Sequence, residues 1–182
     1  MSLIKDIQEK LGRFKLKREQ KRFQRKVKAF SLSNASTVGV LYNATNRTEA
    51  ETIKKFIQYL KEERKEVLSL GFIDSKETSE LINPILNYTF FDQNDLSKSM
   101  VPQSNDVQNF INKPFSILID LNIKDDCFPL EYISSLSLAK FKVGSNGSYR
   151  DDDCDLTIDI SENKKIEYLI IQIKHYLKMI KN

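Results

Sequence analysis

The chain has 182 residues, of which 40% are hydrophobic and 30% are charged, and this balance excludes an intrinsically disordered protein. The first 28 residues hold 11 of the 29 Lys and Arg residues and only three of the 25 Asp and Glu residues, so they carry +8 while the rest carries −4. No run approaches the roughly 18 to 20 apolar residues that cross a bilayer, and the N-terminus lacks the apolar region of a signal peptide. We therefore expect a cytoplasmic protein with a basic arm on a mildly acidic body.

The arm, residues 1–30, is predicted to be a basic amphipathic helix that extends over residues 2–29. Apolar side chains recur at spacings of three and four residues, as on one face of a helix. They are Leu3, Ile4, Ile7, Leu11 and Phe14, followed by Phe23, Val27 and Phe30. This stripe is narrow and surrounded by cations, so the helix must lie on a surface or on a partner. A polar linker, residues 31–36, is expected to separate the arm from a single domain over residues 36–182.

The first half of the body has the pattern of a β-α-β unit. An apolar, β-branched run at residues 37–42 predicts a strand, and Thr45 or Asn46 is expected to cap the amphipathic helix that follows. A second strand is predicted at residues 67–73. Parallel pairing is the default for two strands that a helix connects.

The second half of the body continues this alternation. Strands are expected at residues 87–91, 115–121, 140–143 and 155–160, and helices at 104–111, at 129–138 and from Ser161 or Asn163 onward. The lysines of the strand at 140–143 are expected to point outward. The near-continuous apolar run at 115–121 is typical of a strand with helices on both faces. The whole pattern predicts a three-layer, Rossmann-like α/β domain with a mostly parallel sheet, preceded by the basic helix.

Candidate ligand contacts in the body lie near the predicted carboxyl ends of strands, where open α/β sheets bind ligands. Asn43 and Asn46 belong to the first strand-to-helix turn, which has no glycine and is therefore neither a dinucleotide fingerprint nor a phosphate loop. Asp120 ends the buried strand, and Gly144 follows the strand at 140–143. These residues are the weak ligand candidates of an alternative function, a small nucleotide- or sugar-nucleotide-binding enzyme. Helix capping is the commoner role of such Asn residues.

The sequence contains no recognisable catalytic or metal-binding set. The carboxylates of residues 151–155 converge on magnesium only if the loop directs them to one point, whereas consecutive Asp residues usually point apart. Such an acidic loop can also contact the basic arm. Cys127 and Cys154 are too few for a zinc site or a disulfide framework, and His175 stands alone. We therefore predict no cofactor and no metal, and favour a binding protein over an enzyme.

Several segments resemble a family of uncharacterised bacterial proteins. They are the basic N-terminal helix and residues 38–41, 70–74, 90–92, 114–120, 139–144 and 155–159. The resemblance extends along most of the chain and implies one intact domain. The family is a domain of unknown function, so the resemblance implies no catalytic residues.

The basic arm is the strongest functional candidate, because cations along a helix neutralise phosphates and release counterions. The residues predicted to contact nucleic acid are Lys10, Arg13, Lys15, Lys17, Arg18, Lys21, Arg22, Arg25, Lys26 and Lys28. We predict an accessory protein that docks on RNA or on an RNA-containing particle such as the ribosome. In one alternative the apolar stripe enters an anionic membrane surface or binds a protein partner. In another the stripe packs on the body and the charges are solvated.

Overall fold

The computed structural model describes residues 3–76 and 88–180, which fold around one six-stranded β-sheet. The strands are β1 (Thr37–Asn43), β2 (Glu66–Ile73), β3 (Thr89–Asp92), β4 (Ile117–Asp120), β5 (Phe141–Ser145) and β6 (Leu156–Ile158). Their order is β3-β2-β1-β4-β5-β6, and every neighbouring pair is parallel. The predicted α/β class with a parallel sheet is confirmed. The chain reverses its direction across the sheet between β1 and β4, which makes this the topological switch point.

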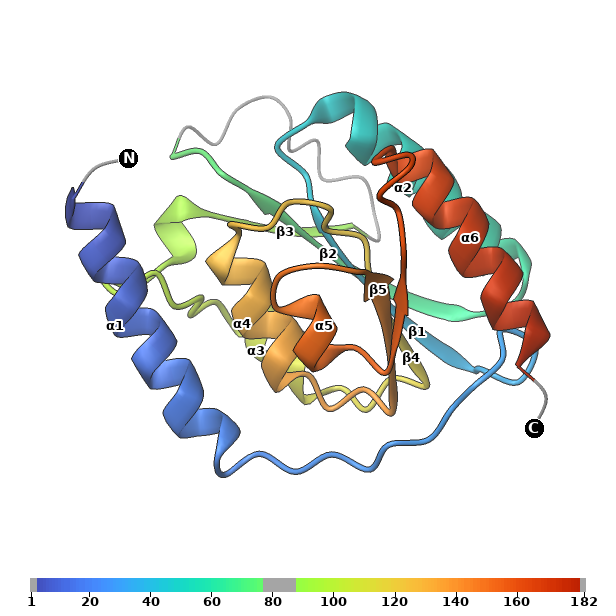
Figure 1. Ribbon diagram of the computed structural model, residues 1–182, viewed down its shortest axis with the longest axis horizontal. Helices are drawn as coiled ribbons and strands as arrows, with labels where there is room; N and C mark the ends of the chain where they lie inside the picture. The colour runs from blue at the N-terminus through green and yellow to red at the C-terminus, as the bar shows by residue number, and fades with distance from the viewer. Residues whose placement is uncertain (1–2, 77–87, 181–182) are drawn as a thin grey trace.

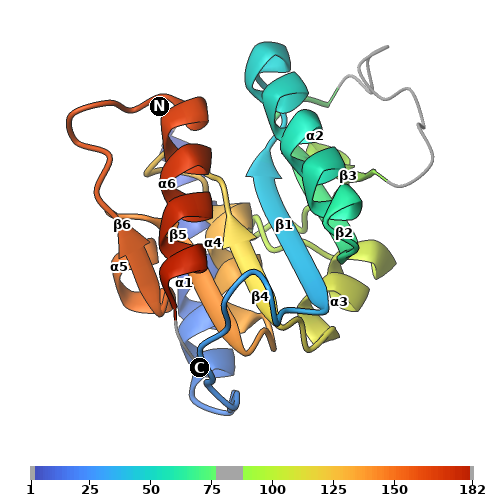
Figure 2. The same cartoon turned by 90° about the vertical axis from the view of Figure 1, so that its right-hand side faces the viewer.

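Helices cover both faces of the sheet (Figures 1 and 2). The helices are α1 (Leu3–Gln20), α2 (Arg47–Glu62), α3 (Asn105–Asn112), α4 (Phe128–Leu136), α5 (Arg150–Asp153), α6 (Ile166–Met179) and the 3-10 turn η1 (Gln93–Asp95). Val40 of β1 packs in the core beneath α2 and α6, whereas its neighbour Leu41 packs in the core beneath α3 and α4. Both faces of β1 are buried, which agrees with its mostly apolar sequence. The burial of every residue of β4 confirms the strand with two covered faces that was predicted at residues 115–121.

Two predicted helix starts are confirmed. The side chain of Asn46 accepts hydrogen bonds from the backbone N–H groups of Thr48 and Glu49 at the start of α2. Ser104 caps α3 in the same way. The start predicted for the last helix is wrong, because the Asn163 side chain accepts from the backbone N–H of Lys165 and forms a separate turn before α6 begins.

The N-terminal helix is shorter than its sequence pattern predicted. It ends at Gln20, and residues 23–30 lie without helix or strand along the body (Figure 1). In this segment the backbone N–H of Lys28 donates to the carbonyl oxygen of Lys140 at 3.0 Å, and the guanidinium of Arg25 pairs with the carboxylate of Asp155. These tertiary contacts replace the intrahelical hydrogen bonds that the spacing of Phe23 and later apolar residues had indicated.

The structure also departs from three further local predictions. Lys142 does not point outward, since its side chain is only 2% exposed and its Nζ donates to the carbonyl oxygen of Ser134 near the end of α4. The acidic loop of residues 151–155 includes most of the short helix α5. The predicted linker also differs from expectation, because Leu32 within it is buried in the core.

No helix of residues 3–76 and 88–180 has the length and hydrophobicity to span a membrane.

Candidate functional site

One face of α1 is fixed against the body. Leu16 is buried in the core formed by α3 and α4, and Gly12 is buried where α1 approaches Ser99 and Phe128. The absence of a side chain at Gly12 permits this close contact. The helix therefore packs on α4 as a fixed element of the structure (Figure 1).

Polar contacts at both edges of this face fix the helix further. The Tyr132 hydroxyl donates to a carboxylate oxygen of Glu19 at 2.6 Å, and the Arg13 guanidinium pairs with Glu131. Burial raises the pKa of the Glu131 carboxyl, and the charge of Arg13 opposes that rise. The same guanidinium also bonds Glu9 of its own helix. These contacts determine which face of α1 remains free.

Replacing Gly12 by Ala is expected to loosen α1 from the body. An added Cβ would lie 2.5 Å from Cε1 of the Phe128 ring and would also collide with the backbone oxygen of Ser99. Overpacking of this kind costs about 1 to 3 kcal/mol, which exceeds the roughly 1 kcal/mol that Ala gains in helix propensity. Hydrogen exchange should accelerate in α1 and stay slow in β1. The exposed substitution Gln20→Ala is the control, and unchanged exchange in the Gly12 variant would contradict the tight contact.

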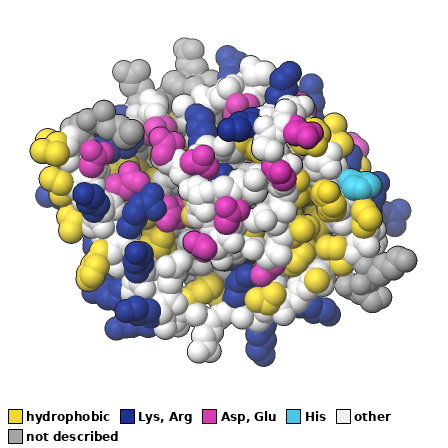
Figure 3. Space-filling model, viewed as in Figure 1, with side chains coloured by type: hydrophobic (Ala, Val, Ile, Leu, Met, Phe, Trp, Pro, Cys, Tyr) yellow, Lys and Arg dark blue, Asp and Glu magenta, His cyan; other side chains and the backbone are white. Residues whose placement is uncertain are grey.

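The opposite face of α1 exposes the predicted apolar stripe. Its side chains are between 52% and 76% exposed, and they are Leu3, Ile4, Ile7, Leu11 and Phe14. Figure 3 shows hydrophobic side chains gathered over α1 beside Lys and Arg side chains. For these five side chains the alternative in which the stripe packs on the body is wrong, since the helix uses its other face for that contact. Phe23 and Phe30, which continue the predicted stripe beyond α1, are partly buried against the core.

Most cations of the arm are free within the described part of the chain. Seven of the ten predicted nucleic-acid contacts are exposed and make no ion pair or side-chain hydrogen bond with residues 3–76 and 88–180, namely Lys10, Lys17, Arg18, Lys21, Arg22, Lys26 and Lys28. The other three bond the body: Arg13 pairs with Glu131, Lys15 donates to Ser99, and Arg25 pairs with Asp155. The last pair is a contact between the arm and the acidic segment, one of the alternatives considered for residues 151–155.

The weak ligand candidates of the body lie mostly at one edge of the sheet. In the register of the sheet, Asp120 of β4 lies opposite Gly144 of β5 on one side and opposite Leu41 of β1 on the other. Asn43, the last residue of β1, follows Leu41 by two positions and therefore lies at the same edge. The Asp120 carboxylate is completely buried, and it accepts hydrogen bonds from the backbone N–H of Asn122 and the hydroxyl of Tyr149. Burial raises its pKa, and these donors and Arg150 oppose the rise. Internal partners thus occupy this carboxylate.

The other three body candidates also have structural roles. The Asn43 side chain accepts from the backbone N–H of Thr45, and Asn46 caps α2 and remains exposed. A Cβ added at Gly144 would lie 3.1 Å from the sulfur of Cys154, so the glycine allows close packing. The structure brings Asn43, Asp120 and Gly144 to the carboxyl ends of the neighbouring strands β1, β4 and β5, whereas Asn46 lies at the start of α2.

One family matches the sequence over residues 8–180, and it is described as a family of unknown function, DUF6913. The chain belongs to the DUF6913 family. The resemblance to a family of unknown function is thereby confirmed, and a search of curated proteins finds no match. The match to DUF6913 includes most of α1 together with the whole sheet, so the docked helix is part of the region that defines the family.

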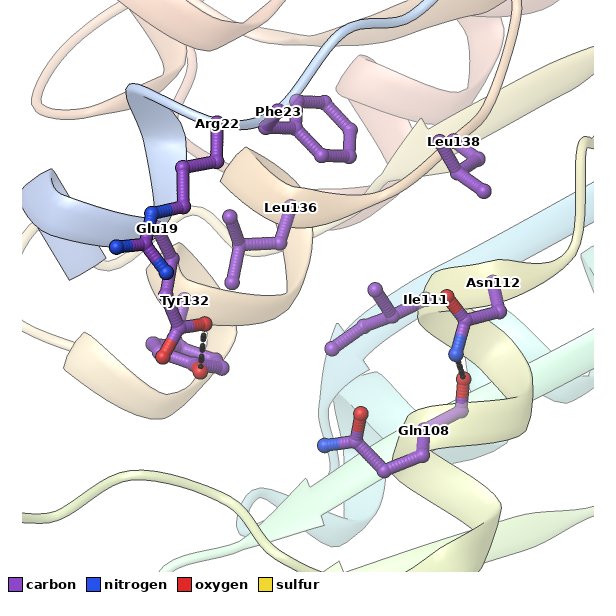
Figure 4. Close-up of a pocket in the computed structure, with 9 residues that line it drawn as sticks. All are labelled: Glu19, Arg22, Phe23, Gln108, Ile111, Asn112, Tyr132, Leu136 and Leu138. Atoms are coloured by element: carbon purple, nitrogen blue, oxygen red, sulfur yellow. Dashed lines mark hydrogen bonds between the residues drawn. The ribbon is translucent and has the colours of Figure 1, made fainter. Parts of the chain in front are cut away.

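The DUF6913 chain also has a cavity of about 290 Å³ where the end of α1 and the residues that follow it meet α3 and α4 (Figure 4). Phe23, Ile111 and Leu136 are among its apolar lining residues, and Arg22 and Asn112 contribute polar groups. Its chemistry suits a small molecule with both apolar and polar parts. The sequence could not indicate it, because its lining comes from separate segments that only the fold brings together.

Three carboxylates of the acidic segment 151–155 of this DUF6913 chain have separate partners. Asp151 accepts from the backbone N–H of Gly147, Asp153 accepts from the hydroxyl of Ser135, and Asp155 pairs with the arm. Within residues 3–76 and 88–180, no three His, Cys, Asp or Glu side chains are grouped as a metal site requires. Burial raises the pKa of both Cys127, to about 12, and Cys154, which disfavours their thiolates.

Proposed function

We propose that this protein is a non-enzymatic docking protein that attaches its α/β body to an anionic membrane surface through the outer face of α1. The observation that supports the proposal is the exposed stripe of five large apolar side chains on a helix whose opposite face is fixed to α4. Contiguous exposed apolar surface marks interaction sites in proteins. A helix with such a stripe between cations has the chemistry of an interfacial membrane helix.

Both components of the outer face contribute to membrane binding. Apolar side chains that enter the boundary between headgroups and acyl chains contribute on the order of 1 kcal/mol each when they are partly buried. Each Lys or Arg near an anionic surface adds about 1 kcal/mol. The cytoplasmic leaflet carries the anionic lipids, which agrees with the cytoplasmic location expected from the sequence.

RNA or an RNA-containing particle is the second candidate. The observation that favours it is the group of exposed cations beyond the end of α1, at Lys21, Arg22, Lys26 and Lys28, where the chain is no longer helical. These cations match phosphates without a need for lipid. RNA offers much less apolar surface to the stripe, and for that reason we rank it below the membrane.

Changing Ile7, Leu11 and Phe14 together to Ser is expected to weaken membrane binding on the order of a hundredfold, because three apolar contacts are lost. The measurement is flotation with vesicles of phosphatidylcholine and phosphatidylglycerol. The folded state should keep its stability, since all three side chains are exposed. A matched control changes Val27, Ile171 and Met179, which are similarly exposed elsewhere, to Ser.

Equal flotation of the stripe variant and the wild type would contradict the membrane proposal. If neither protein floats and both bind RNA at low salt with a steep salt dependence, the RNA candidate replaces it. Changing Lys21, Arg22, Lys26 and Lys28, which are exposed, together to Gln should then abolish that RNA binding. Treatment of cell extracts with nuclease before affinity purification distinguishes the same two partners without added lipid.

A further inference from the structure

A groove of about 430 Å³ lies between α1 and the loop of residues 97–99, at one edge of the apolar stripe. Leu11 and Phe14 of the stripe form its apolar part. Its cationic lining residues are Lys15, Arg18 and Lys98, and the remaining lining residues are Ser97 and Ser99. Cations, hydroxyl groups and apolar surface therefore meet in one hollow, and none of its lining residues is acidic.

The loop that forms one wall of the groove is held in place by its own hydrogen bonds. The Ser97 hydroxyl oxygen accepts from the backbone N–H groups of Ser99 at 3.3 Å and Val101 at 3.2 Å. The side chain of Lys15 crosses from α1 and donates to the hydroxyl of Ser99 at 2.8 Å. Ser99 is buried beneath Gly12. The distance between helix and loop is thus fixed, and one ammonium group is positioned at the wall.

The other two cations are available to a ligand. Arg18 and Lys98 are exposed and have no ion pair or side-chain hydrogen bond among residues 3–76 and 88–180. Three cations in a groove with no acidic lining residue match a phosphomonoester, which carries up to two negative charges near neutral pH. A phospholipid places such a phosphate directly beside its acyl chains, as the groove places its cations beside Leu11 and Phe14.

We propose that the groove binds the headgroup of one anionic phospholipid with a terminal phosphate, of the phosphatidic acid type. Lys15, Arg18 and Lys98 contact the phosphate, and the acyl chain lies along Leu11 and Phe14. This inference rests on the proposed membrane function and adds a lipid preference to it. The exposed cations of α1 would bind any anionic membrane, whereas the groove would bind a terminal phosphate more tightly than a phosphodiester.

The test compares two vesicle types of equal surface charge, phosphatidylcholine with phosphatidic acid and phosphatidylcholine with phosphatidylglycerol. The wild type should bind the first about tenfold more tightly, the effect of one charge-assisted hydrogen bond. The double variant Lys15→Gln, Lys98→Gln should lose that preference. The control Lys10→Gln, Lys17→Gln removes two cations from the other edge of the stripe, as the 100° spacing of helical residues places them. It should weaken binding to both vesicles equally, about 30-fold, and keep the preference.

Two results would contradict lipid binding in the groove and leave membrane docking intact. One is no preference of the wild type for phosphatidic acid, and the other is loss of that preference in the control variant. Failure of the wild type to bind either vesicle overturns the membrane function instead. In that case dihexanoyl phosphatidic acid, titrated as a monomer and followed by NMR, tests the groove separately. Shifts that Lys15→Gln, Lys98→Gln abolishes support the site, and their absence overturns it. Equal competition by inorganic phosphate would assign the site to free phosphate and overturn the lipid.

Discussion

Replacing Arg150 by Met is expected to lower the free energy of unfolding by about 2 to 4 kcal/mol, because a buried carbonyl oxygen loses a donor and the buried carboxylate of Asp120 loses a nearby cation. The Arg150 side chain is only 1% exposed. Its Nη1 donates to the carbonyl oxygen of Lys124 at 3.1 Å, its Nη2 to the carboxylate of Asp125 at 3.0 Å, and its Nε to the carbonyl oxygen of Ser145 at 3.3 Å. One guanidinium therefore ties the loop after β4 to the end of β5.

The loss in this variant is electrostatic, because Met nearly fills the volume of the missing side chain. The carbonyl oxygen of Ser145 loses a donor in a buried site, and an unsatisfied group of this kind costs about 1 to 3 kcal/mol. The carbonyl oxygen of Lys124 keeps the side-chain amide of Asn122 as a donor. The buried carboxylate of Asp120 loses the nearby positive charge that opposes the rise of its pKa. The destabilisation should therefore exceed that of an ordinary truncation in an apolar core of the same volume.

Urea unfolding of the two proteins measures this effect. The slope of the free energy against urea should stay constant, since the surface exposed on unfolding does not change. Arg47→Met is the control, because Arg47 is exposed at the start of α2 and its loss should cost less than about 0.5 kcal/mol. A loss below about 1 kcal/mol in the Arg150 variant would show that the network contributes little to stability.

The sheet and its helices could be predicted because local patterns there agree with the tertiary structure. The apolar run that became β1 is buried on both faces, and the cap at Asn46 marks the start of α2 in the sequence as it does in the structure. Such agreement fails in the arm. The apolar spacing of the arm continues to Phe30, but the helix ends at Gln20. Beyond it the backbone makes tertiary contacts, such as that between Lys28 and Lys140, which the spacing of apolar residues does not reveal.

The candidate site could be predicted only in part. The sequence shows that α1 has an apolar stripe, but the usual inference from such a stripe is that it faces the core. Here the contact face is formed instead by Gly12 and Leu16, together with polar residues that pair with Glu131 and Tyr132. None of these signals identifies a buried helix face in a sequence. The groove was hidden for the same reason, since its second wall is a loop more than 80 residues away along the chain.

Lys142 is expected to make the protein more stable as the pH rises from about 8 to 10.5. Burial, with a further contribution from the charge of Arg25, lowers the pKa of this ammonium group from 10.5 to about 8, while Asp153 and Asp155 oppose the shift. The folded protein thus releases this proton near pH 8, whereas the unfolded chain keeps it until about 10.5. Because the unfolded state binds more protons in this window, stability rises with pH, on the order of 3 kcal/mol over the whole window. Below pH 8 both states are protonated and the residue adds no slope.

Comparison with Lys142→Met isolates this contribution, because tyrosines and other groups that titrate above pH 9 remain in both proteins. The difference in unfolding free energy between wild type and variant, measured in urea across the window, should change in favour of the wild type as the pH rises. Lys140→Met is the matched control, since Lys140 lies two residues earlier and is exposed. Parallel pH profiles for the wild type and the Lys142 variant would mean that the ammonium is solvated. The ring of Phe23 covers this ammonium group, with its centroid 5.8 Å from Nζ. Parallel profiles would therefore also contradict the position of Phe23 and the path of the arm across β5.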